Sequence, residues 1–185
     1  DLLTQMFEEI GAKVPYFQLP HQYDAGILIS APEAQVHFHS DLPGQSLIQI
    51  AGRKRVHIYP SAPPFVTPEN LEDIQLFELE LDMPYHQWYD QYATVLDLEP
   101  GQMLNWPLNA PHRVDNLGTV NISMTVGYEN EEIRRTRIVN LANGLLRNRF
   151  GYTPKSRSLK GPSFWGKAVM QKALRNTSWV KRERK

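Results

Sequence analysis

The chain has 185 residues, of which 41% are hydrophobic and 22% charged, as is ordinary for one globular domain with a buried core. It has no cysteine, which excludes disulfides, iron–sulfur clusters and thiol catalysis, so a bound metal must use His, Asp, Glu or water. No apolar run approaches the length of a membrane span and no signal peptide shows, so we expect a cytoplasmic protein without membrane contact. The chain begins at Asp1 rather than at methionine, and we expect an upstream segment.

Charge divides the chain into two unlike parts. Residues 1–130 hold 5 Lys and Arg against 17 Asp and Glu, whereas residues 131–185 hold 15 against 3. We expect residues 1–130 to form one domain, with an insertion at 61–91, and residues 131–185 to form a basic helical extension. An apolar stripe along residues 131–150 predicts packing on the domain or on a second subunit, so we favour a homodimer over contact with nucleic acid.

Helical spacing of apolar residues appears at both ends of the chain. Residues 1–10 predict a short amphipathic helix that Gly11 ends, and residues 14–25 a loop that runs over the core. Near the other end, residues 131–150 and 163–175 predict two further helices. A basic tail, residues 181–185, follows them.

Short apolar runs between turn residues dominate the middle of the chain. Their density and tight turns favour a mainly β barrel or sandwich over an α/β sheet. The expected strands span residues 26–31, 35–41, 46–51, 54–59, 93–98, 102–106, 112–116 and 120–128.

The insertion at 61–91 interrupts this rhythm with prolines, an acidic stretch at 69–82 and an aromatic, helical segment at 86–92. Insertions of this length often carry function. We expect it to shape the entrance to a site, and its acidic residues hint at a basic or polar substrate.

Two histidines and a carboxylate alternate in residues 35–41. Alternate residues of a strand share a face, so His37, His39 and Asp41 are candidate metal ligands. The spacing of His39 and Asp41, with His112 far along the chain, fits the two-histidine, one-carboxylate triad that holds Fe(II) and leaves positions open for oxygen and a cosubstrate. His37 is then a wall or supporting residue, because the triad is complete without it.

Strand alternation also separates the charged residues around this triad. It places Lys54 on the inward face of residues 54–59, and Arg55 and His57 outward, where we expect His57 at the surface. A lysine in an apolar interior needs an anion, which a dicarboxylate cosubstrate would supply. As an alternative, Lys54 reaches the barrel mouth without a ligand. Near the last strands, we expect Trp106 and Tyr59 to serve packing.

These motifs resemble those of the JmjC-type, cupin-like 2-oxoglutarate oxygenases, which include the asparaginyl hydroxylase of hypoxia-inducible factor. The family has a His-x-Asp pair, then Gly-x-Lys, then a Pro-Gly turn before a distal histidine. The chain is most similar to the bacterial cupin-like proteins of this group, over residues 26–155. The matching positions are His39, Asp41, Gly52, Lys54, Pro100, Gly101, Pro111, His112 and the turn at 151–154.

The resemblance implies a double-stranded β-helix, that is, a jelly-roll or cupin barrel with flanking helices, and a hydroxylase. It implies Fe(II) on His39, Asp41 and His112, with the far carboxylate of 2-oxoglutarate on Lys54. Gln45 occupies a polar family position and could hydrogen-bond that carboxylate.

Two positions depart from the family pattern. Val36 and His37 stand where relatives often have Thr-Pro, and the threonine hydroxyl helps to bind the cosubstrate. Two other interpretations therefore stay open. One is a non-enzymatic cupin module that senses a ligand or regulates. The other is a cupin with a His-x-His metal pair, His37 and His39, although Pro43 and Gly44 occupy the region where its glutamate is expected.

Overall fold

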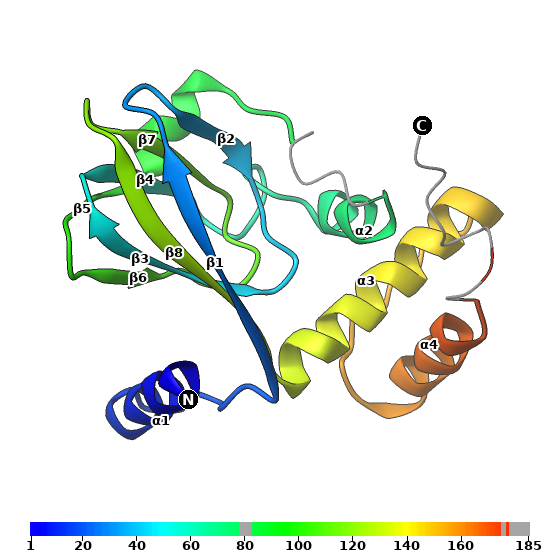
Figure 1. Ribbon diagram of the computed structural model, residues 1–185. Helices are drawn as coiled ribbons and strands as arrows, with labels where there is room; N and C mark the ends of the chain where they lie inside the picture. The colour runs from blue at the N-terminus through cyan, green and yellow to red at the C-terminus, as the bar shows by residue number, and fades with distance from the viewer. Residues whose placement is uncertain (78–82, 175–176, 178–185) are drawn as a thin grey trace.

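The computed structural model describes residues 1–77, 83–174 and 177. It contains two antiparallel four-stranded sheets flanked by helices, so the expectation of a mainly β protein is confirmed (Figure 1). The last part of the acidic stretch, residues 78–82, and the basic tail lie outside the described residues.

Every expected strand is present; the strand at 112–116 has the expected ends, and the other strands are shifted at one or both ends. One sheet has the order β1-β8-β3-β6 and the other β2-β7-β4-β5, so the chain crosses between the sheets at every connection except that from β4 to β5. The predicted loop is wrong in its last part, because β1 begins at Gln22 and pairs there with Glu129. The strands are β1 (Gln22–Ser30), β2 (Gln35–His39), β3 (Gly44–Ala51), β4 (Lys54–Ile58), β5 (Thr94–Leu98), β6 (Met103–Asn105), β7 (His112–Asn116) and β8 (Asn121–Glu129).

The helices lie on different sides of the sheets, with α2 between the sheets and α3 (Figure 1). They are α1 (Leu2–Lys13), α2 (Pro68–Phe77), the 3-10 helix η1 (Gln87–Tyr92), α3 (Glu131–Phe150) and α4 (Gly161–Leu174). The prediction that Gly11 ends the first helix is wrong, since the helix runs on to Lys13. The prediction for α3 is confirmed: the Asn130 side chain caps its start, and Gly151, at φ 65°, ends it.

One apolar cluster packs the two sheets together, and another packs the insertion onto them. The first lies between the sheets and comprises Leu47, Val56, Leu98, Trp106, Ala110 and Val114. The second joins β2 and β4 to the insertion and comprises Phe38, Tyr59, Phe65, Val66, Ile74, Met83 and Tyr89. The insertion is therefore packed against the sheets by buried aromatic residues rather than standing away from them.

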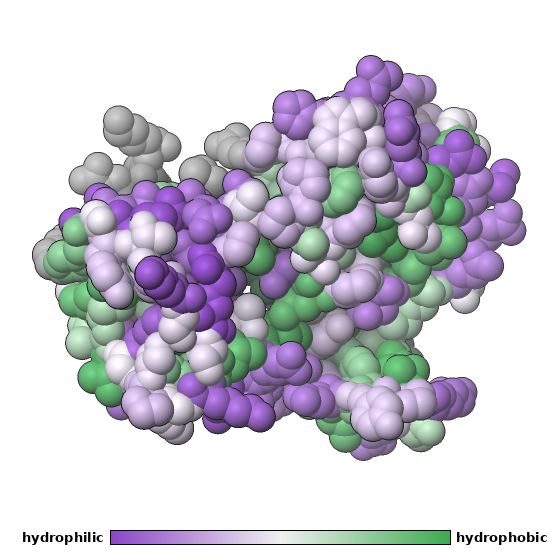
Figure 2. Space-filling model, turned by 180° about the vertical axis from the view of Figure 1, so that it is seen from behind, coloured by the Kyte–Doolittle hydropathy of each residue, from purple (hydrophilic) through white to green (hydrophobic). Residues whose placement is uncertain are grey.

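Five arginines of the basic extension pair with acidic groups of the same chain. From behind, hydrophilic side chains cover much of the side of α3 and α4, and others cover the outer edge of the sheets (Figure 2). Much of the charge that we noted in the sequence is thus balanced within the molecule, while the homodimer stays a prediction. The pairs are Arg134 and Arg135 with Glu131, Arg137 with Glu129, Arg147 with Glu72 and Asp73, and Arg157 with Glu69 and Glu72.

Glu72 is the buried centre of this pairing. Its side chain is 1% exposed and accepts from Arg147 at 3.1 Å, Arg157 at 3.0 Å and Asn143 at 3.2 Å. A carboxylate buried among two guanidinium groups and an amide is fully hydrogen-bonded, so it ties α2 to α3 and to the segment before α4.

Glu72→Gln should lower the free energy of unfolding by roughly 2 to 3 kcal/mol, because it removes a buried charge that two arginines need. Urea unfolding of the whole chain measures this. Glu69→Gln is the control: its side chain is 47% exposed, so the loss should stay below about 0.5 kcal/mol. Equal losses in the two variants would show that Glu72 has no special part in joining the helices.

No helix in the described part of the chain is long and apolar enough to cross a membrane.

Candidate metal centre

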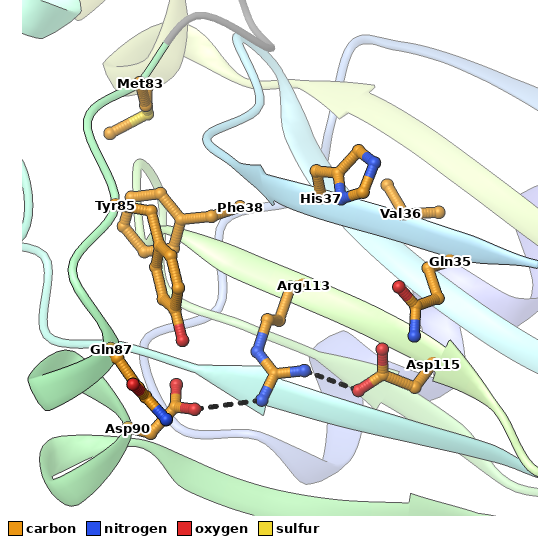
Figure 3. Close-up of a pocket in the computed structure, with 10 residues that line it drawn as sticks. All are labelled: Gln35, Val36, His37, Phe38, Met83, Tyr85, Gln87, Asp90, Arg113 and Asp115. Atoms are coloured by element: carbon orange, nitrogen blue, oxygen red, sulfur yellow. Dashed lines mark hydrogen bonds and ion pairs between the residues drawn. The ribbon is translucent and has the colours of Figure 1, made fainter.

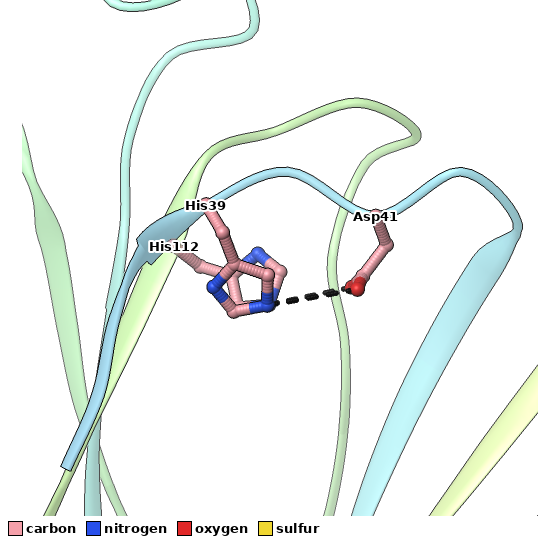
Figure 4. Close-up of side chains that lie close together, drawn as sticks. All are labelled: His39, Asp41 and His112. Carbon is pink, nitrogen blue, oxygen red and sulfur yellow. Dashed lines mark ion pairs between the residues drawn. The ribbon is translucent and has the colours of Figure 1, made fainter. Parts of the chain in front are cut away.

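The pairing of β2 with β7 brings the predicted ligands together. His39 and His112 are direct partners across these strands, and Asp41 follows two residues after His39. One ligand atom from each of His39, Asp41 and His112 lies within 4.8 Å of the others (Figure 4). The three side chains that the sequence placed in one site therefore lie in one cluster.

Backbone carbonyl groups fix the orientation of both imidazole rings. The Nδ1 of His39 lies 2.8 Å from the carbonyl oxygen of His37, and the Nδ1 of His112 lies 3.1 Å from that of Ala110. Because a carbonyl oxygen only accepts, each Nδ1 must carry the proton. Both Nε2 atoms then face the Asp41 carboxylate, at 3.6 Å from His39 and 3.3 Å from His112.

This cluster has the donor set of a cation site. His39 is 9% exposed and His112 is 2% exposed, and burial lowers the pKa of His112 to about 4. His112 is then neutral at neutral pH, so its Nε2 faces the carboxylate as an acceptor facing an acceptor. A divalent cation between two imidazole nitrogens and a carboxylate would relieve that arrangement, and this ligand set suits iron.

A small cavity of about 120 Å³ adjoins the cluster and contains the other residues that we assigned to the cosubstrate. Lys54 lines it and is 3% exposed, and within the described part of the chain it has no hydrogen bond or ion pair. Burial lowers the pKa of Lys54. Gln45 lines it too, and its Oε1 is buried without a hydrogen-bond partner among the described residues. The cavity is thus lined both by the three candidate metal ligands and by a buried lysine and a buried amide.

Thr125 and Trp106 are among the side chains at this cavity that were not assigned to the site from the sequence. Thr125, on β8, lines it with a hydroxyl, and Trp106 lies with its ring centroid 4.3 Å from that of His112. We expected Trp106 only to pack, and it does lie in the core between the sheets. The alternation of β8, in which Asn121 and Ser123 are buried, was the signal that Thr125 faces inward.

The expectation that His37 shares a face with His39 is wrong. Between Val36 and His39 the register with β7 shifts by one residue, because Val36 pairs with Val114 and His39 with His112. Such a bulge puts Val36 and His39 on the same face. His37 lines a separate, larger cavity on the other side of the strands (Figure 3). Val36 lines both cavities.

His57 was expected at the surface and is buried instead, at 9% exposure. His57 does face outward, as the alternation predicted, but there it lies against Arg113 and Asp115 of β7. The Nε2 of His57 lies 3.3 Å from Asp115, and its Nδ1 lies 3.3 Å from Arg113. Burial, followed by the charge of Arg113, lowers the pKa of His57. Arg55, also predicted to face outward, pairs with Asp97.

No protein-family model and no curated protein matches the chain. Among solved structures, hydroquinone 1,2-dioxygenase from Sphingomonas sp. TTNP3 is similar at 10% identity over 60% of this chain and 61% of that one, with a TM-score of 0.42. A Cupin 2 conserved barrel domain protein from Salinispora arenicola has 11% identity over 66% and 76%, with a TM-score of 0.39. Drosophila melanogaster CENP-C bound to CAL1 has 11% identity over 55% and 58%, with a TM-score of 0.37.

The chain spans 61% of the length of that dioxygenase chain and 58% of that CENP-C chain. One of the three is named as a cupin barrel. The likeness is partial at these scores, so the residues of the cavity decide what this chain can bind.

The metal-free protein should lose stability as the pH falls from about 6.5 to about 4. The pKa of His112 is about 4 in the folded chain and roughly 6.5 in the unfolded chain, so the unfolded chain takes up the proton first. We expect the free energy of unfolding to fall by roughly 3 kcal/mol over this range. Chemical unfolding with a chelator present, across this pH range, measures it.

His112→Gln should remove this part of the pH dependence, because glutamine does not titrate. His21→Gln is the control, since the side chain of His21 is 49% exposed. A slope that His112→Gln leaves unchanged would contradict the assignment.

Proposed function

We propose that this protein is an Fe(II)- and 2-oxoglutarate-dependent oxygenase that hydroxylates a substrate. The observation that carries the proposal is the single cavity in which His39, Asp41 and His112 lie beside a buried lysine without an ion pair among the described residues. A cation site next to an unneutralised Lys54 suits a cosubstrate that is both a metal chelator and a dicarboxylate.

The strand orders support a double-stranded β-helix as the scaffold. Eight strands form two antiparallel sheets in the orders β1-β8-β3-β6 and β2-β7-β4-β5, and one continuous chain winds between them. Jelly rolls, including cupins, are double-sheet structures of eight strands. Such a scaffold holds His39, Lys54 and His112 on β2, β4 and β7, while Asp41 lies in the short connection from β2 to β3.

Each residue of the cavity has a part in binding. His39 and His112 would hold the iron through Nε2, and Asp41 through its carboxylate. Lys54 would bind the far carboxylate of 2-oxoglutarate, and a rotation of the Gln45 amide would present its N–H to the same group. Bound together, the iron and cosubstrate supply oxidative decarboxylation coupled to hydroxylation of a C–H bond.

Thr125 could replace the threonine that the family pattern has at the position of Val36. Its hydroxyl lies 3.4 Å from the carbonyl oxygen of Gly26, which is a long contact for a hydroxyl donor. The hydroxyl can therefore turn to a ligand at little cost. We infer that Thr125 on β8 supplies the hydroxyl that relatives place on the strand of the His-x-Asp pair.

The cavity opens between the edges of the two sheets. Leu28, on the edge strand β1, and Val36, on the edge strand β2, line the cavity and are 43% and 41% exposed. Leu47, Trp106 and Val114 close the inner side and exclude water from it. A substrate would therefore approach past Leu28 and Val36, which favours an apolar group beside the reacting carbon.

Binding of 2-oxoglutarate by the iron-loaded protein under anaerobic conditions tests the function. We expect saturable binding by calorimetry, then release of succinate and carbon dioxide when oxygen is admitted. Asp41→Ala should lose iron and both signals, whereas Asp97→Ala, whose carboxylate pairs with Arg55, should keep them. Iron-loaded protein that binds no 2-oxoglutarate would sink the proposal and favour the non-enzymatic module or another metal cupin.

Lys54→Met should weaken 2-oxoglutarate binding at least about tenfold, because the far carboxylate loses a charge-assisted partner. It should also raise the free energy of unfolding of the ligand-free protein by roughly 1 to 2 kcal/mol, because it removes a buried, unpaired charge. Iron affinity should not change.

Arg55→Met is the matched control, because Arg55 is the next residue on β4, faces outward and pairs with Asp97. It should leave the affinity for 2-oxoglutarate unchanged. A Lys54→Met variant that binds 2-oxoglutarate as tightly as the parent would mean that Lys54 does not hold the cosubstrate.

A further inference from the structure

Strand β1 is an open edge of its sheet, hydrogen-bonded to β8 on one side only (Figure 1). It has nine residues, and its register with β8 is regular over all of them. Its middle part, residues 25–29, carries no charge and no proline. Ile27 is 57% exposed, Leu28 43% and Ile29 73%. A long, regular and apolar edge of this kind is a template on which another strand can pair.

The three other edge strands have features that hinder such pairing. β6 is only three residues long. β2 has five residues and a shift of register at its bulge. β5 also has five, and the pair of Asp97 with Arg55 puts charge on it. Proteins protect sheet edges by short length, bulges and charge. Residues 25–29 of β1 have none of these protections.

The hydrogen-bond ladder fixes which groups of β1 point outward. On β3, the N–H of Gln49 donates to Gln102, towards β6. Residues of an inner strand bond alternately to the two neighbouring strands, so this bond sets the alternation across the sheet. Followed through β3 and β8, it turns Gly26 and Leu28 of β1 towards β8. The N–H and carbonyl groups that point away from the sheet are therefore those of Ala25, Ile27 and Ile29.

We propose that β1 pairs with β1 of a second copy of this chain, antiparallel, about a two-fold axis at Ile27. In this register Ile27 meets Ile27 of the partner subunit, and Ala25 meets Ile29 of the partner subunit. Each outward N–H and carbonyl group of these residues then has a partner. A shift of the register in one direction would set Asp24 against Leu28 of the partner subunit, and a shift in the other would leave Ala25 without a strand residue opposite. A strand that is its own complement suits the two-fold symmetry of most oligomers.

The side chains on the outer face of the sheet favour the same partner. Directly paired residues share a face of a sheet. One apolar row crosses all four strands on that face, namely Ile27, Met124, Ile48 and Met103. The two-fold axis would join this row end to end with the same row of a second copy, and it would cover Ile27 and Ile29. A row that continues into itself favours a second copy over a strand of an unrelated protein.

The partner would also border the inner cavity, the one beside the metal cluster. Gly26 and Leu28 share the inner face of β1, and Leu28 lines that cavity. In the proposed register, Leu28 of the partner subunit lies opposite Gly26, which has no side chain to fill the space. The pairing goes beyond the proposed oxygenase activity and does not rest on it, since it needs no metal.

Sedimentation velocity of the whole chain with chelator present, from about 1 to 100 µM, tests the pairing. We expect a species of twice the chain mass whose share rises with concentration. Ile27→Lys should raise the dissociation constant of the dimer at least about tenfold, because it sets two like charges opposite each other at the axis. The side chain of Ile27 is largely exposed, so this variant keeps the fold, which circular dichroism checks.

Ile50→Lys is the matched control. Ile50 is 47% exposed and lies on β3, which β8 separates from β1. The same substitution there should leave the dissociation constant unchanged.

A single cysteine at the axis tests the register. The chain has no cysteine of its own. Opposed residues of a hydrogen-bonded antiparallel pair have Cα atoms about 5.5 Å apart, which lies within the range that a disulfide spans. Mild oxidation should therefore link two chains of Ile27→Cys, and should not link two chains of Ile50→Cys.

Three results would each overturn the proposal: a chain that stays monomeric at about 100 µM, an Ile27→Lys variant that dimerises as well as the parent, or an Ile27→Cys variant that does not cross-link. A monomeric chain would leave this edge to a strand of another protein. A dimer that is insensitive to both changes at Ile27 would favour α3 as the interface.

Discussion

His39 on β2 and His112 on β7 are direct partners, and one extra residue of β2 separates this pair from the next pair, Val36 with Val114. In a regular strand, residues three apart point to opposite faces. The bulge puts Val36 and His39 on the inner face together and sends His37 and Phe38 outward. One irregularity therefore builds the wall of the inner cavity, the wall of the outer cavity and part of the aromatic cluster under the insertion.

Lys54 shows that the inner cavity is not arranged for stability. A lysine that is 3% exposed, with no ion pair among the described residues, opposes folding, as do acceptor atoms that face each other across His112 and Asp41. Well-packed apolar side chains would make a more stable barrel. Local conflicts of this kind in an otherwise consistent fold are expected where ligands bind, because the ligands resolve them.

Much of this arrangement could be predicted from the sequence, and the limits have a physical cause. Turn residues marked the strands, and strand alternation marked His39 and Asp41, because both are local properties. His112, far along the chain, was joined to them by the facial-triad pattern and by the resemblance to a known family. The bulge that turns His37 outward is a property of the pairing between β2 and β7, so the sequence of β2 alone does not predict it. The burial of His57 likewise depends on long-range contacts, since Arg113 and Asp115, which lie against it, are more than about 50 residues away along the chain.

The contacts of Glu72 could not be foreseen for the same reason, since Arg147 lies 75 residues away along the chain. Helix α3, by contrast, was predicted over its full length, because its start and end depend on neighbours in sequence. Apart from the placement of His112, contacts between residues far apart in the chain could not be predicted, whereas the type of most elements could.

The metal cluster also joins two strands that differ in their resistance to local opening. β2 is a five-residue strand at the edge of its sheet, hydrogen-bonded on one side only, whereas β7 lies between β2 and β4. Edge segments open at lower free energy than central ones, and their amide hydrogens exchange sooner with solvent. A cation held by both His39 and His112 would join the edge strand β2 to the central strand β7. The rate of release of that cation would then be set by the local opening of β2, while the rest of the two sheets stays folded.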